Sequence, residues 1–476
     1  MHTLRCLLSA AVVPAVSALL LPHQSHIKEA TQEVEALRDD EVAPRDDEAA
    51  PRDEESRAVT ALSLQRLSRS SFQDFAAEGV LYVNSERLAQ AGYGRTFDNE
   101  DDPDLGKSTE QLVLDNGYPL EKYNATTPDG YVLGLFRIPH GQNSSSGPEQ
   151  RPPVLLQHGF LDCSTSFVIN KPEQSLAFIL ADAGWDVWLG NNRGNDYSRA
   201  HVTLDTKSAD FWDFTWDEMA EYDLPTEINF VLAHNGAARL AYVGHSEGSM
   251  QAWAKLSQDQ ELASKLSVLV AMAPVAFVKN QRVLFIDFLR DLGVIRILNL
   301  LEPNVDMDAK LIRKLIPNVC EKGHLLLETG ICTSLVDTVF GASKHLNSTR
   351  LPVYFSIAPS STSTKNVAHF AQMTKSGKFA RYDYMSRAKN QLRYNRPRPL
   401  EYRLADYKVP TALFSGTSDA LADPADVQRL RKSLSPGVVI SDVEIPNYSH
   451  IDFIWGVDAN VLLYPKVLEV LRAFSP

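Results

Sequence analysis

The pentapeptide Gly-His-Ser-Glu-Gly at residues 244–248 has the pattern G-x-S-x-G, and it decides the fold. An apolar run, residues 240–243, precedes it, and residues 249–256 after it have the composition of a helix. At a strand-to-helix turn this pattern holds the serine on a sharp, strained corner. Its glycines avoid the clash that a Cβ would make with the neighbouring strand and helix. The sequence therefore predicts that the hydroxyl of Ser246 is held out at the C-terminal edge of a sheet.

Strand-like and helix-like stretches alternate around this turn. The patterns that predict strands lie at residues 121–126, 131–138, 153–157, 185–189, 240–243, 267–274, 410–415 and 438–440. Helices are expected at residues 177–183, 216–232, 249–256, 425–433 and 461–474. Such alternation predicts an α/β protein with a mostly parallel central sheet and helices on both faces.

The alternation breaks between residues 275 and 404, where amphipathic helical patterns and a Ser/Thr-rich loop replace the strands. We therefore expect a core of residues 106–274 and 405–476 with a mainly helical insertion of residues 275–404. Within the insertion, Val283–Leu289 has an apolar face. This face fits either a lid that opens onto lipid or the core of the insertion, and the sequence leaves both open.

The N-terminal part of the chain has a different composition. Residues 1–21 carry one basic residue followed by a run of low polarity that is short for a bilayer span, so they predict a secretory signal peptide. An uncleaved anchor is the alternative. Residues 22–105 are acidic and of low complexity, and we expect them to be mostly disordered, as a pro-segment or a solvated tail. No later run is apolar enough to predict a transmembrane segment in the mature chain.

The net charge restricts the classes of binding partner, and the glycosylation sequons indicate the cellular compartment. The net charge of −13 at pH 7 argues against nucleic acid, because proteins that bind it need a basic surface. Asn124, Asn143 and Asn347 are candidate glycosylation sites, whereas Asn447 lies too near the expected active site. With the signal peptide, they predict a protein of the secretory pathway, either extracellular or lysosomal.

Neither the cysteines nor any motif in the sequence predicts a metal or cofactor site. Cys320 and Cys332 either close a small disulfide loop or remain free core residues, and Cys163 is expected to be unpaired. No H-E-x-x-H or paired-cysteine spacing predicts a metal site. The polar loop Asn192–Asn195 lacks the lysine and glycine spacing of a phosphate-binding loop.

A serine hydroxyl becomes a good nucleophile when a base takes its proton and a third group orients that base. On this scaffold the acid and then the histidine follow the serine, each in a loop after a later strand. Asp419 and His450 occupy those places. Asp423 precedes a proline and is expected to cap a helix. We interpret Asp452 as a surface or supporting carboxylate and His245 as a packing residue aimed away from the serine.

The tetrahedral intermediate of ester hydrolysis needs two backbone donors for its oxyanion. The candidates are the N–H of Glu247, directly after the serine, and the N–H of Phe160, after the strand that ends in His158-Gly159. The side chain of Glu247 has to point away from the site, because a carboxylate there opposes the developing negative charge. We expect Glu247→Gln to shift mainly the acidic limb of the pH profile.

From about Ser108 to its C-terminus the chain resembles the acid lipase family, of the lysosomal and gastric lipase type. The resemblance rests on Asn116–Pro119, Leu156–Gly159, Asn192–Asn195, Phe211–Trp212, Asp217–Met219, Tyr222–Pro225, the pentapeptide, Leu421–Pro424 and His450–Gly456. It implies an α/β-hydrolase fold with an inserted helical cap and lid. It also implies hydrolysis of acylglycerols or sterol esters at an oil-water or membrane surface. Its site residues fall on Ser246, Asp419 and His450, with Phe160 and Glu247 as oxyanion donors, and its cap has cysteines as this chain has Cys320 and Cys332.

This sequence departs from the family at Phe160, Glu247 and Ser249, where the family usually has Leu, Gln and Thr. Main-chain donors survive such substitutions, but the pH profile and the shape of the acyl pocket can differ. The expected function is a carboxylic ester hydrolase for lipid esters that forms an acyl-enzyme. The alternatives are an inert lipid-binding protein on the same scaffold and an esterase for short-chain, non-lipid esters.

Overall fold

The computed structural model describes residues 102–142, 150–282, 313 and 336–475, which all belong to one compact unit. Three expectations lie largely or wholly outside the described residues. They are the signal peptide at residues 1–21, the acidic stretch at residues 22–105 except for its last four residues, and the lid candidate Val283–Leu289. Cys320, Cys332 and Asn143 also lie outside them.

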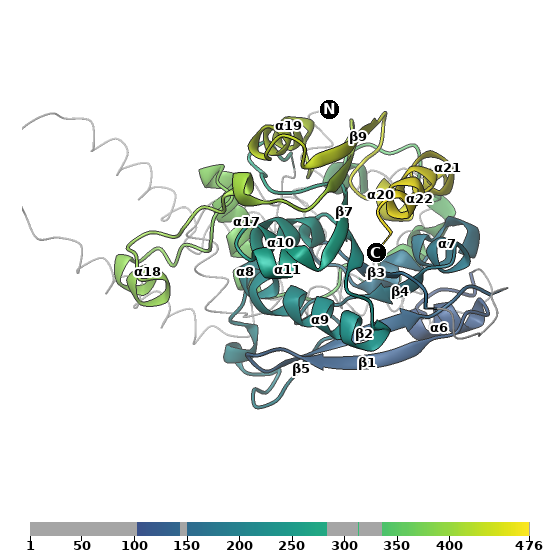
Figure 1. Ribbon diagram of the computed structural model, residues 1–476, viewed down its shortest axis with the longest axis horizontal. Helices are drawn as coiled ribbons and strands as arrows, with labels where there is room; N and C mark the ends of the chain where they lie inside the picture. The colour runs from purple at the N-terminus through teal and green to yellow at the C-terminus, as the bar shows by residue number, and fades with distance from the viewer. Residues whose placement is uncertain (1–101, 143–149, 283–312, 314–335, 476) are drawn as a thin grey trace, which may run out of the picture. The chain divides into compact units, whose positions relative to one another are not determined.

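A nine-stranded sheet forms the centre of the described chain (Figure 1). Its strands are β1 (Glu121–Thr126), β2 (Tyr131–Ile138), β3 (Pro153–Gln157), β4 (Asp186–Leu189), β5 (Ala200–His201), β6 (Leu240–His245), β7 (Leu266–Met272), β8 (Thr411–Gly416) and β9 (Val439–Ile445). They are ordered β1-β2-β4-β3-β6-β7-β8-β9, and β5 pairs with β2. The pairings of β2 are antiparallel, and the pairings from β4 to β9 are parallel. The predicted α/β fold with a mostly parallel sheet is confirmed.

The burial of the strands explains why their sequences are recognisable. Every residue of β3, β4, β6, β7 and β8 is buried, as expected for parallel strands that helices cover on both faces. The strands at the two ends of the sheet, β1 and β9, instead contain alternating exposed and partly buried residues. Continuous apolar runs therefore mark the central strands, and alternation marks the edges.

The helices are α6 (Thr109–Asp115), α7 (Leu176–Asp182), α8 (Trp216–Glu218), α9 (Leu224–Asn235), α10 (Glu247–Leu256), α11 (Gln260–Ser264), α16 (Leu351–Ile357), α17 (Thr364–Ser376), α18 (Arg387–Tyr394), α19 (Pro424–Ser433), α20 (Asp452–Trp455), α21 (Ala459–Leu462) and α22 (Tyr464–Ala473). Figure 1 shows α9 and α10 on one side of the strands and α7 and α22 on the other. The elements described between β7 and β8 are helices and isolated bridges. No helix in the described ranges is long and apolar enough to cross a membrane.

Two helices differ from the sequence prediction, and a proline is the reason in each. The chain predicted as one helix at residues 216–232 passes through α8, a π-helical turn (Met219–Asp223) and α9. Pro225 lies in the first turn of α9, where its missing N–H does no harm, but it cannot donate to the turn before it. The helix predicted at residues 461–474 is likewise divided into α21 and α22, with Pro465 in the first turn of α22.

Candidate active site

Ser246 lies on the tight turn between β6 and α10, with φ 53° and ψ −117°. The turn requires both flanking glycines. A Cβ on Gly248 would lie 2.5 Å from the carbonyl oxygen of Gln157 on β3, and a Cβ on Gly244 would lie 2.7 Å from the backbone nitrogen of Ser249. Distances this short are not tolerated between a Cβ and backbone atoms, so glycine is needed where the strand and the helix approach the turn.

The structure brings Ser246, His450 and Asp419 into one hydrogen-bonded row. The Nε2 atom of His450 lies 2.8 Å from the hydroxyl oxygen of Ser246. Its Nδ1 atom lies 2.9 Å and 3.0 Å from the two carboxylate oxygens of Asp419. Because a carboxylate accepts, Nδ1 carries the proton and Nε2 is free to accept from the serine. All three side chains are buried.

Backbone groups hold the carboxylate of Asp419 in place. It follows the end of β8, and its Oδ1 accepts hydrogen bonds from the N–H groups of Leu421 (2.9 Å) and Ala422 (2.7 Å). Asp423, the alternative acid, instead caps α19 through a hydrogen bond from the N–H of Ala425, as predicted. The two nearby aspartates therefore have different roles, since Asp419 orients His450 and Asp423 caps a helix.

Two further side chains hold the loop of His450. The predicted direction of His245 is wrong, and Asp452 is the supporting carboxylate, one of the two roles that the sequence allowed. His245 is hydrogen-bonded through Nε2 to the carbonyl oxygen of His450 (3.0 Å), so it does not point away from the site. Burial lowers the pKa of His245 to about 3, which keeps its ring neutral. Asp452 is fully buried, and it accepts from the N–H of Ser449 (2.6 Å) and the hydroxyl of Ser343 (2.6 Å). The contacts of His245 with His450 and of Asp452 with Ser343 depend on tertiary packing, which no local pattern reveals, whereas the bond from Ser449 to Asp452 is local.

Gly159 brings the backbone before Phe160 against the serine. A Cβ on Gly159 would lie 3.0 Å from the Cβ of Ser246. The carbonyl oxygen of Gly159 is hydrogen-bonded to Nδ1 of His158 (2.8 Å). In a trans peptide the N–H points opposite to the carbonyl, so this bond turns the N–H of Phe160 away from His158. No described residue accepts from the N–H of Phe160 or from that of Glu247, the first residue of α10.

A polar network holds the ring of His158. Its Nε2 accepts from the N–H of Asn192 and from the side-chain amide of Asn195, each at 3.1 Å. The side-chain amide of Gln157 in turn donates to Asn192 (2.8 Å). Burial lowers the pKa of His158 to about 4, so the ring is neutral with its proton on Nδ1. The loop Asn192–Asn195, which has no phosphate-binding pattern, therefore supports the candidate oxyanion loop.

The side chain of Glu247 is buried against α17. Its Oε1 accepts from the side-chain amide of Asn366 (2.8 Å), whose own oxygen accepts from the N–H of Trp216. Burial raises the pKa of the Glu247 carboxyl to about 7, with Asn366 opposing this shift and Asp223 adding to it. The group is therefore neutral in acid and becomes a buried carboxylate above neutrality.

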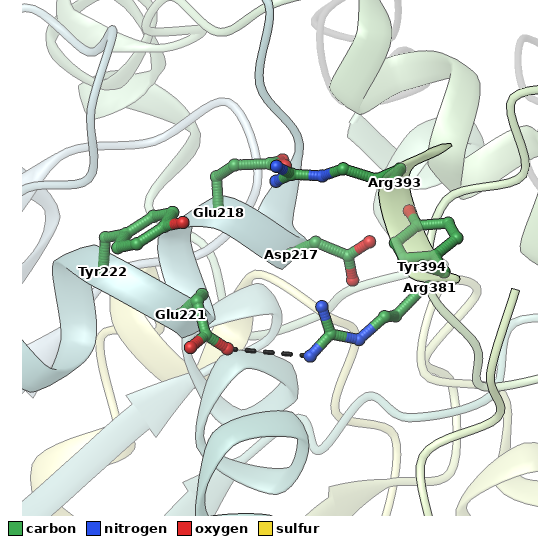
Figure 2. Close-up of a pocket in the computed structure, with 7 residues that line it drawn as sticks. All are labelled: Asp217, Glu218, Glu221, Tyr222, Arg381, Arg393 and Tyr394. Atoms are coloured by element: carbon green, nitrogen blue, oxygen red, sulfur yellow. Dashed lines mark hydrogen bonds and ion pairs between the residues drawn. The ribbon is translucent and has the colours of Figure 1, made fainter. Parts of the chain in front are cut away.

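A polar cavity has a volume of about 210 Å³, and none of the site residues described above lines it. Figure 2 shows its lining residues, which are Asp217, Glu218, Glu221, Tyr222, Arg381, Arg393 and Tyr394. Ion pairs join Arg393 to Glu218 (3.0 Å) and Arg381 to Glu221 (3.6 Å). Such a charged lining does not suit an acyl chain. Within the described ranges, no group of three or more His, Cys, Asp or Glu residues could hold a metal ion.

Comparison with known proteins gives consistent matches. A family model described as "Partial alpha/beta-hydrolase lipase region" matches residues 109–171, and one described as "alpha/beta hydrolase fold" matches residues 152–299. Gastric triacylglycerol lipase of Bos taurus is 39% identical over 374 residues, covering 78% of this chain and 92% of that protein. Lysosomal acid lipase/cholesteryl ester hydrolase of Homo sapiens is 38% identical, covering 79% and 93%. Lipase member M of Mus musculus is 37% identical, covering 78% and 87%.

Proposed function

Since the chain belongs to the acid lipase family of α/β-hydrolases, we propose that it hydrolyses triacylglycerols or sterol esters with Ser246 as its nucleophile. The observation that carries the proposal is the row of hydrogen bonds from Ser246 through His450 to Asp419. The substrate class follows from two relatives, one named a triacylglycerol lipase and the other a cholesteryl ester hydrolase. Ester hydrolysis is the chemistry that this family and this set of side chains share.

The proposed reaction has two halves. In the first, the hydroxyl oxygen of Ser246 attacks the ester carbonyl carbon while Nε2 of His450 takes its proton. The oxyanion accepts hydrogen bonds from the N–H groups of Phe160 and Glu247. The leaving alcohol then takes the proton from His450, and an acyl-enzyme remains. In the second half water attacks this ester, again with His450 as base, and the fatty acid leaves. Asp419 stabilises the imidazolium in both halves.

A substrate panel tests this proposal. Purified protein is given emulsified triolein, cholesteryl oleate and a p-nitrophenyl ester series of increasing chain length, at several pH values. We expect fatty acid release from at least one of the two long-chain lipid esters. If only the shortest p-nitrophenyl esters are hydrolysed, the protein is an esterase for short-chain esters and the lipase proposal is wrong.

The inert lipid-binding alternative has a separate test. A fluorophosphonate probe labels a serine that a neighbouring base activates, and it leaves ordinary serines unmodified. We expect one probe per protein, attached to Ser246. Tight binding of lipid without labelling would favour the inert carrier.

We also propose that the protein travels through the secretory pathway to the lysosome or the outside of the cell. Two relatives carry the words gastric and lysosomal in their names. Asn124 is exposed on the edge strand β1, where an oligosaccharide has room. The further features proposed with it are a signal peptide at residues 1–21, a disulfide between Cys320 and Cys332, and glycosylation at Asn124, Asn143 and Asn347. Peptide mass spectrometry of protein from a eukaryotic secretory host tests each of them.

A further inference from the structure

A basic stretch of the chain lies between α17 and β8. Residues 385–400, here called the basic arm, contain five Lys or Arg residues and no Asp or Glu. The whole chain carries a net charge of −13, so the arm at +5 leaves −18 for the other residues. A dense group of cations on an acidic protein attracts anionic partners locally, although the molecule as a whole repels them.

The inner side of the basic arm is fixed by a hydrogen bond within the arm and by contacts with the rest of the protein. Ser386 caps the start of α18 by accepting from the N–H of Lys389. Asn390 is buried and donates to the carboxylate of Asp383 (2.8 Å). Arg393 forms the ion pair with Glu218 at the cavity of Figure 2. These contacts fix the inner side of α18, which Figure 1 shows at the end of a long loop and apart from the other labelled helices.

The outer side of the basic arm combines free cations with exposed apolar side chains. The cations are Arg387, Lys389, Arg396 and Arg398, which are all exposed and have no ion-pair partner among the acidic residues that the structure describes. The apolar side chains are Leu392, Met385 and Leu400, exposed to 90%, 48% and 42%. Lys389 and Leu392 are three residues apart and share one face of α18. Single exposed apolar side chains are ordinary, but three of them in the basic arm, together with four cations unpaired within the described residues, make a surface that is both apolar and basic.

We propose that the basic arm docks the protein on an anionic lipid surface. The four free cations contact the negative groups of that surface, and Leu392 enters its apolar layer. Each Lys or Arg near an anionic membrane strengthens binding by about fivefold at moderate salt, so four of them suffice for reversible docking. The inference rests on the proposed function, because hydrolysis of lipid esters releases fatty acids whose carboxylates make the surface more anionic.

The exposed apolar side chains decide between a lipid surface and a soluble polyanion. An acidic peptide or a nucleic acid would pair with the cations and leave Leu392 in water. A lipid surface offers anionic groups at its outer edge and hydrocarbon a few ångströms deeper, which matches the mixture of side chains on the arm. Within the described residues, the arm is the stretch where several unpaired cations and a nearly fully exposed leucine occur together.

Sedimentation with vesicles tests the proposal on the full chain carrying Ser246→Ala, so that no lipid is hydrolysed during binding. The vesicles are phosphatidylcholine alone or with about a third of phosphatidylserine, and salt is varied. In the test variant Arg387, Lys389, Arg396 and Arg398 become Gln. In the matched control the same four charges are removed elsewhere, at the exposed residues Lys408, Lys432, Lys466 and Arg472. A third variant carries Leu392→Ser alone.

We expect the parent and the matched control to bind the anionic vesicles at least tenfold more tightly than neutral ones, and high salt to release them. The test variant should lose this preference, and Leu392→Ser should weaken binding at all salt concentrations. Equal binding of test and control variants would overturn the proposal, as would tighter binding to soluble polyglutamate than to anionic vesicles. In a separate experiment the same arm substitutions are made in protein that keeps Ser246, and hydrolysis of a soluble ester is measured. If the parent and all arm variants fail to hydrolyse the ester, the proposed function is contradicted, and the docking proposal is still decided by vesicle binding.

Discussion

Glu247 follows Ser246 directly, and its carboxyl group is buried where the turn meets α17. Burial raises its pKa from an ordinary 4.5 to about 7, so the group is neutral throughout the acid range. Ionisation above neutrality places a negative charge beside a backbone N–H that is proposed to stabilise an oxyanion. We therefore expect this charge to act on the alkaline limb of the pH profile, and not on the acidic limb as the sequence alone suggested.

Glu247→Gln should remove this alkaline loss. In the parent protein, kcat should fall about tenfold between about pH 6 and pH 8 through a group with a pKa near 7, because the buried charge opposes the transition state. The variant should lack that step, since the amide keeps the contact to Asn366 and cannot ionise. The measurement is the ratio of kcat at the two pH values on a soluble ester. The same fall in both proteins would contradict the assignment.

Stability should respond to the same group with a definite sign. A carboxyl group with a raised native pKa binds its proton more tightly when folded, so stability declines as pH rises from about 4.5 to about 7. Over that window the parent should lose up to about 3 kcal/mol relative to Glu247→Gln. Urea unfolding of both proteins at several pH values checks this. A constant difference would mean that the carboxyl is not buried.

His158 acts on the proposed oxyanion site through one hydrogen bond to Gly159. His158→Ala should lower kcat by about tenfold or more with a small change in KM, because the N–H of Phe160 loses its fixed direction. His158→Asn should recover part of the activity, since its amide can donate near the position of Nδ1. Steady-state kinetics on a soluble ester give both numbers. Equal activity of all three proteins would show that His158 only fills space.

At the scale of elements, the turn that carries Ser246 depends on contact between α10 and β3. Gly248→Ala should destabilise the protein by about 2–3 kcal/mol, because its Cβ would meet the carbonyl oxygen of Gln157 at 2.5 Å. Gly437→Ala is the control. A Cβ there meets no atom within 4 Å, and its cost of about 1 kcal/mol comes from the positive φ alone. Urea unfolding should separate the two variants, and equal losses would show that the turn has room to relax.

The elements that sequence predicted well are those that local chemistry determines. The central strands are buried on both faces and are continuous apolar runs, so their positions agree within a few residues. Asp423 was recognisable as a helix cap from the proline after it. The divisions at Pro225 and Pro465 had the same kind of signal, but the helical pattern around each proline concealed it. The network around His158 could not be predicted, because it joins loops that only the strand order brings together.

At the scale of the whole molecule, an ion-pair cluster ties the start of the described chain to the region between β7 and β8. Arg350 is buried and pairs with Asp102 (2.8 Å) and Asp104 (2.6 Å). A chain of residues 100–476 retains both aspartates and should fold with a melting temperature close to that of the full chain. A chain of residues 106–476 should lose about 3 kcal/mol, because a buried guanidinium loses its partners. Calorimetry of the two truncated proteins checks this, and equal stabilities would contradict it.

The sequence predicts the architecture of the whole molecule and the three residues brought together at the candidate site, because a G-x-S-x-G turn restricts where an acid and a histidine can follow. It does not reveal what Glu247 contacts, since Asn366 is more than a hundred residues away. The sequence also does not show that four cations of the basic arm are exposed on one surface and unpaired within the described chain. The cations are visible in the sequence, but only the fold shows that Arg393 is paired and that its four neighbours are not.

The central claim is that Ser246, activated by His450, is the nucleophile of a lipid ester hydrolase. The most direct measurement is the initial rate of oleic acid release from emulsified triolein by the parent protein and by Ser246→Ala, with melting curves to confirm that both are folded. We expect Ser246→Ala to lower the rate by at least about a thousandfold, because the general base then has no hydroxyl to activate. Release of oleic acid by the folded alanine variant at the parent rate would contradict it.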